Sequence, residues 1–403
     1  MTARVNGGGT DGDLVDRVRR RLAGGPTGLD DVVRAESDGI LDDTVFAAVR
    51  RNVDAELHGA GPLEPLLALP GVTDVLVNGP GDVWFDRGDG MERAAVAFAG
   101  ETAVRRLAQR LVAGAGARLD DALPYADAVL SDGTRVHAVL PPLAEHTTIS
   151  LRVLARRPLD LDGLTERGAM PGAIADVLRA VVAARLAFVI SGGTGTGKTT
   201  LLGALLAAVP PGERVLLIED APELVVAHPH VVRLVTRGTN VEGAGAVGLR
   251  ELVRQALRMR PDRLVVGEVR GAEVCELLAA LNTGHEGGAG TLHANSPAEV
   301  PARLEALAAL GGMARNALHS QLAAAVHVVL HVVRRDGVRE LAAVGVLERG
   351  SELVRVVPAW QKGRWGPGRQ RLLELLDGAL CVGSADGAHR VGSADDQGHG
   401  VAC

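Results

Sequence analysis

Lysine, aromatic residues and cysteine are all scarce in this chain of 403 residues. Of its 43 basic residues only Lys198 and Lys362 are lysine, so a lysine kept against this arginine bias is a candidate for a specific role. Aromatic residues make up 2% of the chain, so its core must be built from leucine, valine and alanine. The three cysteines form no C-x-x-C pair, which argues against a zinc site or a disulfide framework.

Long hydrophobic runs are also missing. The longest, residues 322–333, contains two histidines and is too short to span a bilayer. The polar N-terminus lacks the apolar segment of a signal peptide. We therefore expect a cytoplasmic protein that associates with the inner face of the membrane only through a partner. The formal net charge of −6 argues against bulk nucleic-acid binding.

The apolar pattern predicts an α/β protein in several parts. Short apolar strands alternate with helical segments in the second half of the chain, as in a parallel sheet that is buried on both faces. We predict an N-terminal extension with helices at 1–55, an α+β domain at 56–155, a linker at 156–168 and an α/β domain at 169–346. Residues 347–403 are expected to be a tail, largely disordered after about residue 360.

The strongest motif is a glycine-rich segment between an apolar strand and a helical pattern. It matches G-x-x-x-x-G-K-[ST], in which glycines let backbone N–H groups surround phosphates and a helix N-terminus adds a positive dipole end. Lys198 would supply charge to the β- and γ-phosphates of ATP, and Thr199 would ligate Mg²⁺. The residues expected to bind ATP are Gly192, Gly193, Thr194, Gly195, Thr196, Gly197, Lys198, Thr199 and Thr200.

Acidic residues follow two further apolar strands. Glu268, which ends the segment LVVGE, could hold Mg²⁺ or orient an attacking water. In the segment IEDAPE, Asp220 could instead cap a helix, and Glu223 is the better candidate for a catalytic base. Two histidines near glycine turns, His285 and His293, could sense the γ-phosphate. A turn histidine bonded only to backbone is the commoner interpretation of such a residue.

Several ordered motifs together resemble the secretion ATPases of the type II/type IV superfamily. After the glycine-rich segment come IEDAPEL, LRMRPDRLVVGEVRG, LNTGHEGG and TLHANSP. Within the superfamily the resemblance is greatest to the CpaF/TadA branch, which powers assembly of Tad (Flp) pili. It covers about residues 55–345 and includes GPLEPLLALPGVTDVLVNGP and DGTRVHAVLPPL.

The resemblance implies a RecA-like P-loop domain and a role for each motif. Residues 192–199 would be the Walker A motif, Glu268 the Walker B acid, and His293 part of a histidine box. An acidic box would contain Glu219, Asp220 and the catalytic Glu223. Arginines that reach the nucleotide from the N-terminal domain of related proteins match Arg135 and Arg152.

The resemblance also implies a ring-shaped homo-hexamer that hydrolyses ATP to power pilus assembly or protein secretion. A hinge at about residues 155–165 would close on ATP and pass force to an integral-membrane platform protein. The alternative is a conjugative DNA-transfer ATPase. A RecA-like helicase is disfavoured by the acidic charge and the lack of a basic and aromatic stripe. A regulatory module that no longer hydrolyses ATP is disfavoured because Glu223 and Glu268 are both present.

The sequence departs from this superfamily at several points, among them its cysteines and one glycine-rich loop. It cannot form the four-cysteine zinc module of many pilus-extension and type II secretion relatives, and its loop GHEGGAG is richer in glycine than the usual form.

Overall fold

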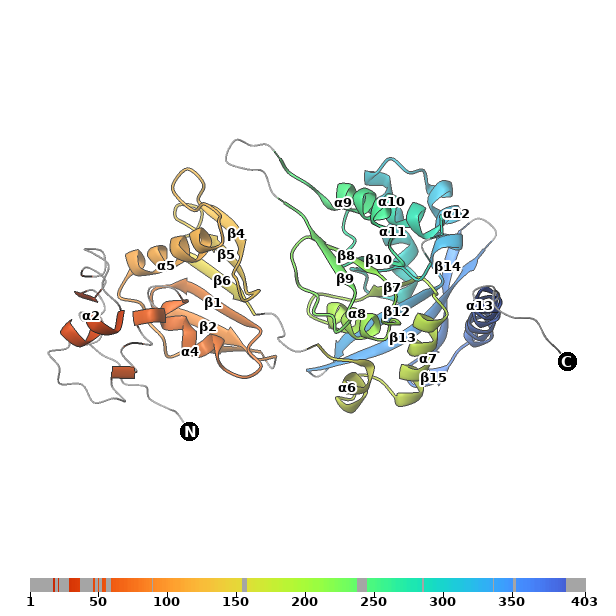
Figure 1. Cartoon of the computed structure of the whole chain (residues 1–403), viewed down its shortest axis with the longest axis horizontal. Helices are drawn as coiled ribbons and strands as arrows, with labels where there is room; N and C mark the ends of the chain where they lie inside the picture. The colour runs from red at the N-terminus through yellow and green to blue at the C-terminus, as the bar shows by residue number, and fades with distance from the viewer. Residues whose placement is uncertain are drawn as a thin grey trace, which may run out of the picture. The chain divides into compact units, whose positions relative to one another are not determined.

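The computed structural model divides the chain into two compact units, residues Met1–Ala155 and Arg156–Cys403 (Figure 1). It describes residues 59–88, 90–153, 158–237, 245–284, 286–335, 337–350 and 353–388, with short helical pieces before residue 56. One of these pieces is helix α2, Leu29–Glu36. Most of the N-terminal extension expected at residues 1–55 lies outside the described residues.

The first unit contains an antiparallel sheet of six strands in the order β3-β2-β1-β6-β5-β4. Helix α5, Glu101–Gly114, buries leucine and valine side chains in the same apolar core as the sheet. Two short elements, η1 (Gly61–Leu63) and α4 (Glu64–Leu67), precede the sheet. The strands are β1 (Asp74–Gly79), β2 (Asp82–Asp86), β3 (Met91–Arg93), β4 (Tyr125–Val129), β5 (Arg135–Val139) and β6 (Thr148–Arg152).

The second unit is built on a sheet of nine strands in the order β15-β14-β13-β12-β7-β11-β10-β8-β9. Strands β12, β7, β11, β10, β8 and β9 run parallel, and β13, β14 and β15 extend the sheet in antiparallel fashion. The strands are β7 (Phe188–Ser191), β8 (Val215–Glu219), β9 (Val231–Val235), β10 (Arg263–Val266), β11 (Ala289–Leu292), β12 (Val328–Arg335), β13 (Val338–Arg349), β14 (Val354–Gln361) and β15 (Arg364–Trp365). This arrangement confirms the α/β fold class.

Helices cover both faces of the nine-stranded sheet (Figure 1). One face packs against α6 (Leu161–Glu166), α7 (Gly172–Ala183), α8 (Lys198–Ala207) and α13 (Arg369–Ala388). The other packs against α9 (Leu249–Ala256), α10 (Val274–Leu281), α11 (Val300–Leu310) and α12 (Arg315–Ala325). Short 3₁₀ turns occur at η2 (Leu257–Met259) and η3 (Pro297–Glu299). Because apolar helices cover both faces, the central strands consist mostly of apolar residues, as expected for a parallel sheet.

Two sequence-based boundaries are wrong. Residues 161–166, expected in a linker, form helix α6, because Leu161 and Leu164 pack into the core of the second unit. Residues 354–377, expected in the tail, form β14, β15 and the start of α13, and Leu372 and Leu376 are buried in the same core. The second unit therefore begins before residue 169 and ends after residue 346, the bounds that the apolar pattern indicated.

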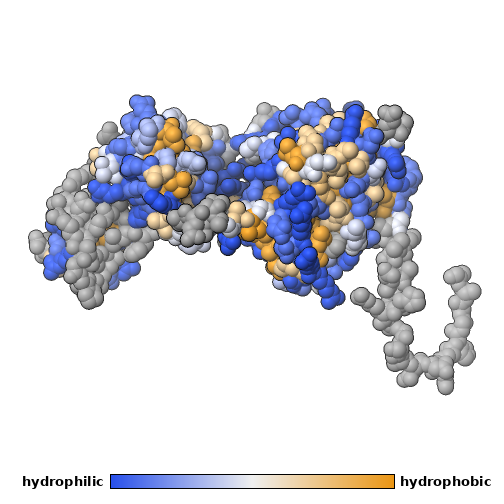
Figure 2. Space-filling view, turned by 90° about the horizontal axis from the view of Figure 1, so that it is seen from above, coloured by the Kyte–Doolittle hydropathy of each residue, from blue (hydrophilic) through white to orange (hydrophobic). Residues whose placement is uncertain are grey.

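On the face drawn in Figure 2, hydrophilic residues are interspersed with patches of apolar residues. Among the described residues, no helix has the length and apolar character needed to cross a membrane.

Candidate functional site

The glycine-rich segment forms a loop between strand β7 and helix α8. Ser191 ends the strand and Lys198 is the first residue of the helix. Gly195 and Gly197 have φ values of +71° and +95°, which L-residues with side chains rarely adopt. At Gly192 an added Cβ would lie 2.3 Å from the carbonyl oxygen of Val332. The loop therefore needs glycine at these positions to follow its path.

Lys198 is buried at the start of α8, in the concavity of the loop. Its Nζ donates to the carbonyl oxygens of Gly192 and Gly193, at 3.0 and 2.7 Å. Thr196 Oγ1 also donates to the Gly193 carbonyl, at 2.9 Å. Thr199 follows Lys198 in the first turn of the helix, where backbone N–H groups have no partner within the helix. The structure thus gathers a cation, hydroxyl groups and backbone donors at one point.

A histidine and a carboxylate from neighbouring strands meet beside this lysine. His293 follows β11, Glu268 follows β10, and the two strands are adjacent in the sheet. His293 Nε2 lies 3.5 Å from Lys198 Nζ and 3.0 Å from Glu268 Oε1. Burial and the nearby Lys198 charge lower the pKa of His293 below its ordinary value. This shift favours the neutral ring. In the tautomer with the proton on Nε2, the ring donates to Glu268, and Lys198 Nζ is then a neighbouring charge and not a hydrogen-bond donor to that nitrogen.

Arg270 extends this line of contacts to the next strand end. Its Nη2 lies 2.7 Å from Glu268 Oε2, and its Nε lies 3.2 Å from Asp220 Oδ2. Asp220 directly follows β8, the neighbour of β10. Sequence reasoning missed Arg270, although its position two residues after Glu268 was a usable signal. The sequence also suggested that Asp220 could cap a helix; in the structure Asp220 pairs with Arg270.

The two glutamates of the acidic segment have different environments. Glu219 is buried at the end of β8, where burial raises the pKa of its carboxyl group. Its Oε1 accepts hydrogen bonds from the backbone of Glu223 and Leu224, at 3.0 and 2.9 Å, and its Oε2 pairs with Arg233 at 2.9 Å. Glu219 therefore fixes the loop that carries Glu223, and the Glu223 side chain is only partly buried.

The remaining predicted residues lie elsewhere or outside the described part. Arg135 begins β5 and Arg152 ends β6, and the two are direct partners across these antiparallel strands of the first unit. They form a pair of basic residues on the sheet of that unit. His285 lies outside the described residues.

Two side chains that sequence reasoning missed contact the loop from strands β12 and β13. The buried His331 places its Nδ1 2.9 Å from Ser191 Oγ, directly before the loop. Arg339 donates from Nε to the carbonyl oxygen of Gly195, at 3.1 Å. Neither residue lies in a motif, and only the pairing of β12 with β7 brings this hairpin beside the loop.

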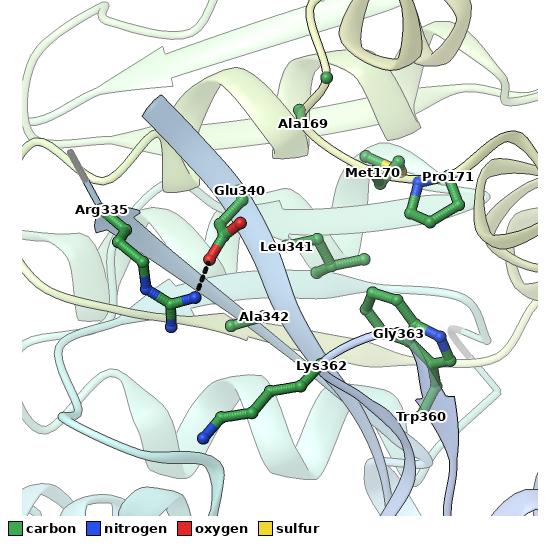
Figure 3. Close-up of a pocket in the computed structure, with 11 residues that line it drawn as sticks. Ala169, Met170, Pro171, Arg335, Glu340, Leu341, Ala342, Trp360, Lys362 and Gly363 are labelled. Atoms are coloured by element: carbon green, nitrogen blue, oxygen red, sulfur yellow. Dashed lines mark ion pairs between the residues drawn. The ribbon is translucent and has the colours of Figure 1, made fainter. Parts of the chain in front are cut away.

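A pocket of about 320 Å³ opens at the same edge of the sheet, beyond β12 and β13. Figure 3 shows the ion pair of Arg335 and Glu340, 3.1 Å apart, on one side, and Met170, Pro171 and Trp360 on the other. The pocket therefore combines an apolar wall with charged groups. Its lining is Gly168, Ala169, Met170, Pro171, Arg335, Glu340, Leu341, Ala342, Trp360, Lys362 and Gly363.

This donor set suits a polyphosphate and a divalent cation. Gly192 and Gly197 let the loop pass close to Val332 and Arg339, and Lys198 and the N-terminus of α8 supply positive potential beside it. Glu268 offers two oxygens that already attract cationic or hydrogen-donating groups, and oxygen ligands are those that Mg²⁺ prefers.

Comparison with known proteins gives a family and a number of similar proteins. The family model described as "Type II/IV secretion system protein" matches residues 56–375. A Mycobacterium tuberculosis protein, whose name assigns it provisionally to conjugal transfer, is 58% identical over 333 residues, covering 81% of this chain and 95% of that protein. The type IV secretion system protein PtlH of Bordetella pertussis is 36% identical over 282 residues, covering 62% of this chain and 80% of PtlH.

A solved structure supports the same fold. The crystal structure of the pilus retraction motor PilT with bound ADP aligns with a TM-score of 0.51 at 17% identity, covering 78% of this chain and 85% of PilT. The extent of the family match, together with the relative at 58% identity, shows that the chain belongs to the type II/IV secretion system protein family.

Proposed function

We propose that the chain hydrolyses ATP with Mg²⁺ and converts the reaction into mechanical work for pilus assembly or protein secretion. One observation carries this proposal: Lys198, His293 and Glu268 form a line of contacts, at 3.5 and 3.0 Å, across three strand ends. Phosphoryl transfer depends mainly on positioning and on charge neutralisation around the phosphates. A lysine in a glycine loop beside a carboxylate supplies both.

Each residue of the loop has a role in this proposal. The backbone N–H groups of residues 192–200 bind phosphate oxygens, and Lys198 exchanges its bonds to the carbonyls of Gly192 and Gly193 for bonds to phosphate. Thr199 and Glu268 hold the Mg²⁺ ion, which, when bound, neutralises charge on the phosphates.

We assign the general base to Glu223. Both oxygens of Glu268 are engaged, by His293 and by Arg270, so Glu268 is suited to a fixed charge beside the metal. Glu223 is held by its backbone and only partly buried, so its carboxylate can reach a water. His293 senses the γ-phosphate through its contact with Lys198. Arg135 and Arg152 neutralise charge that develops in the transition state.

We further propose a homo-hexameric ring of the CpaF/TadA branch, bound to a membrane platform protein on the inner face of the cell membrane. The motif resemblance over residues 55–345 supports this assignment. A hinge between the units would transmit the work, and it must precede helix α6, because Leu161 and Leu164 pack into the core of the second unit. The acidic net charge of the chain argues against direct nucleic-acid binding.

The second candidate is a conjugative DNA-transfer ATPase with the same chemistry and a different cargo. The observation in its favour is the relative at 58% identity whose name refers to conjugal transfer. The two candidates differ in the machinery that the motor drives, and hence in its membrane partner.

The proposed chemistry is tested by Glu223→Gln, with Lys198→Ala as the comparison. Glu223→Gln should bind ATP normally but release phosphate at least about 100-fold more slowly, because a general base typically contributes 10²–10⁴-fold. Lys198→Ala should lose nucleotide binding as well. Binding is measured with a fluorescent ATP analogue and turnover by phosphate release. Normal turnover in Lys198→Ala would refute the site, and normal turnover in Glu223→Gln would refute only the choice of base.

A further inference from the structure

Arg339 is the residue of strand β13 that lies against the glycine loop. Its Nε donates to the Gly195 carbonyl at 3.1 Å. Its Cδ lies 3.4 Å from the point that a Cβ of Gly197 would occupy. Both glycines have the positive φ values that shape the loop. The side chain of Arg339 therefore lies against both Gly195 and Gly197, two glycines of the loop with positive φ values.

The sheet fixes this placement. Strand β12 runs parallel to β7, with His331 opposite Ser191, so the end of β12 continues alongside the loop. Strand β13 returns antiparallel, and Arg339 is the partner of Arg334. Residues on paired strands are held more precisely than residues on a loop. Arg339 thus reaches Gly195 from a rigid support.

The guanidinium group has more donors than this contact uses. Arginine carries five N–H donors, and the bond to Gly195 occupies Nε alone. The nearby Arg335 has an acidic partner in Glu340, whereas Arg339 has no acidic partner within 4.0 Å among the described residues. Its charge therefore remains exposed beside the loop, on the side opposite His293 and Glu268.

We propose that Arg339 is a positioning residue for the phosphates of the bound nucleotide. Its bond to Gly195 holds the loop in the conformation that directs backbone N–H groups inward, and its charge raises the affinity of the loop for polyphosphate. This inference rests on the proposed ATPase function and adds a residue to that site. It assigns Arg339 to the phosphate end of the nucleotide and not to the reacting atoms.

The test compares Arg339→Ala and Arg339→Lys with Arg355→Ala. Arg355 is an exposed arginine of the same sheet, paired with Glu348 at 3.0 Å. We expect Arg339→Ala to raise KM for Mg·ATP, and Ki for inorganic tripolyphosphate, by about tenfold each, since a hydrogen bond from a charged group is lost. The value of kcat should stay within about threefold. Arg339→Lys should be intermediate, because it keeps the charge without the planar fork, and Arg355→Ala should be unchanged.

Three results would overturn the inference. Unchanged KM and Ki would show that Arg339 does not act on the site. A raised KM with an unchanged Ki would assign Arg339 to the nucleoside end, toward the pocket lined by Met170 and Trp360. A fall in kcat alone would make it a catalytic residue. Absence of turnover in the unmodified protein would instead contradict the proposed function, and calorimetry with tripolyphosphate would still test Arg339.

Discussion

At the residue scale, Gly192 lies close to the backbone of strand β12, which occupies the space that a side chain would need. An added Cβ would lie 2.3 Å from the Val332 carbonyl oxygen and 2.8 Å from Thr196 Oγ1. We predict that Gly192→Ala lowers the free energy of unfolding by about 1–3 kcal/mol, as overpacking does, and weakens ATP binding. Urea unfolding and nucleotide titration measure these effects.

Gly193→Ala is the matched control for this prediction. It is exposed, and the nearest atom to its added Cβ is 3.6 Å away, which is ordinary contact. Its stability should change by less than about 0.5 kcal/mol. Equal effects of the two substitutions would show that close approach to Val332 does not shape the loop.

A second residue-scale prediction concerns His331, which lies behind the loop. Burial lowers the pKa of His331, so the folded protein holds the neutral ring. The unfolded chain binds the proton near pH 6.5. The stability gained from His331 is therefore complete above about pH 6.5 and is lost as pH falls from there through the lower native pKa. We expect His331→Gln to flatten the acid-side loss of stability by up to about 1.4 kcal/mol per pH unit.

Urea unfolding of the unmodified protein and of His331→Gln, from pH 7.5 to 5.0, measures how steeply the free energy of unfolding of each falls with pH. Parallel curves would show that another group causes the loss.

The strand-end pattern predicted Lys198 and Glu268 at one edge of the sheet, because parallel strands share that edge. His293 was indicated only by its position near glycine turns and by the family resemblance, because strand β11 before it was not recognised. The strand-end pattern could not predict His331 or Arg339, since their role depends on which strand pairs with β7.

At the scale of elements, helix α13 packs against one face of the nine-stranded sheet. Leu372 and Leu376, one turn apart, are buried in its core, whereas Leu373 is 38% exposed. We predict that Leu372→Ala costs about 3 kcal/mol of unfolding free energy, in the range for buried leucines. Leu373→Ala, with the same change in chemistry, should cost less than about 1 kcal/mol. Chemical denaturation of the two variants checks this, and equal losses would mean that α13 does not pack as described.

The apolar pattern does not indicate strands β11 and β14, for physical reasons that can be identified. Strand β11 reads AGTL, and its small residues hide a fully buried strand: an added Cβ on Gly290 would lie 3.1 Å from a Val269 methyl. Strand β14 contains Pro358, which usually excludes a strand. Pro358 sits where the pairing with β13 shifts register, opposite Gly345, and is tolerated there. Short strands with small residues or proline form only because neighbouring strands pair with them. The sequence alone therefore predicted fewer strands than the sheet contains.

At the scale of the whole molecule, each unit has its own apolar core. The contacts from Lys198 to Asp220 lie within the second unit alone. Arg135 and Arg152 lie in the first unit. If these arginines complete the site in a ring, turnover must depend on assembly, whereas nucleotide binding need not.

The most direct measurement of the central claim is phosphate release from Mg·ATP across a size-exclusion profile of the purified protein. The account predicts activity in a peak of roughly hexameric size and much less in monomeric fractions, because a site completed between subunits exists only where subunits are in contact, and in a closed ring every subunit has such a contact. Monomeric fractions should still bind nucleotide. Full activity in a monomer would contradict the composite site, and no activity in any fraction would contradict the proposed ATPase function itself.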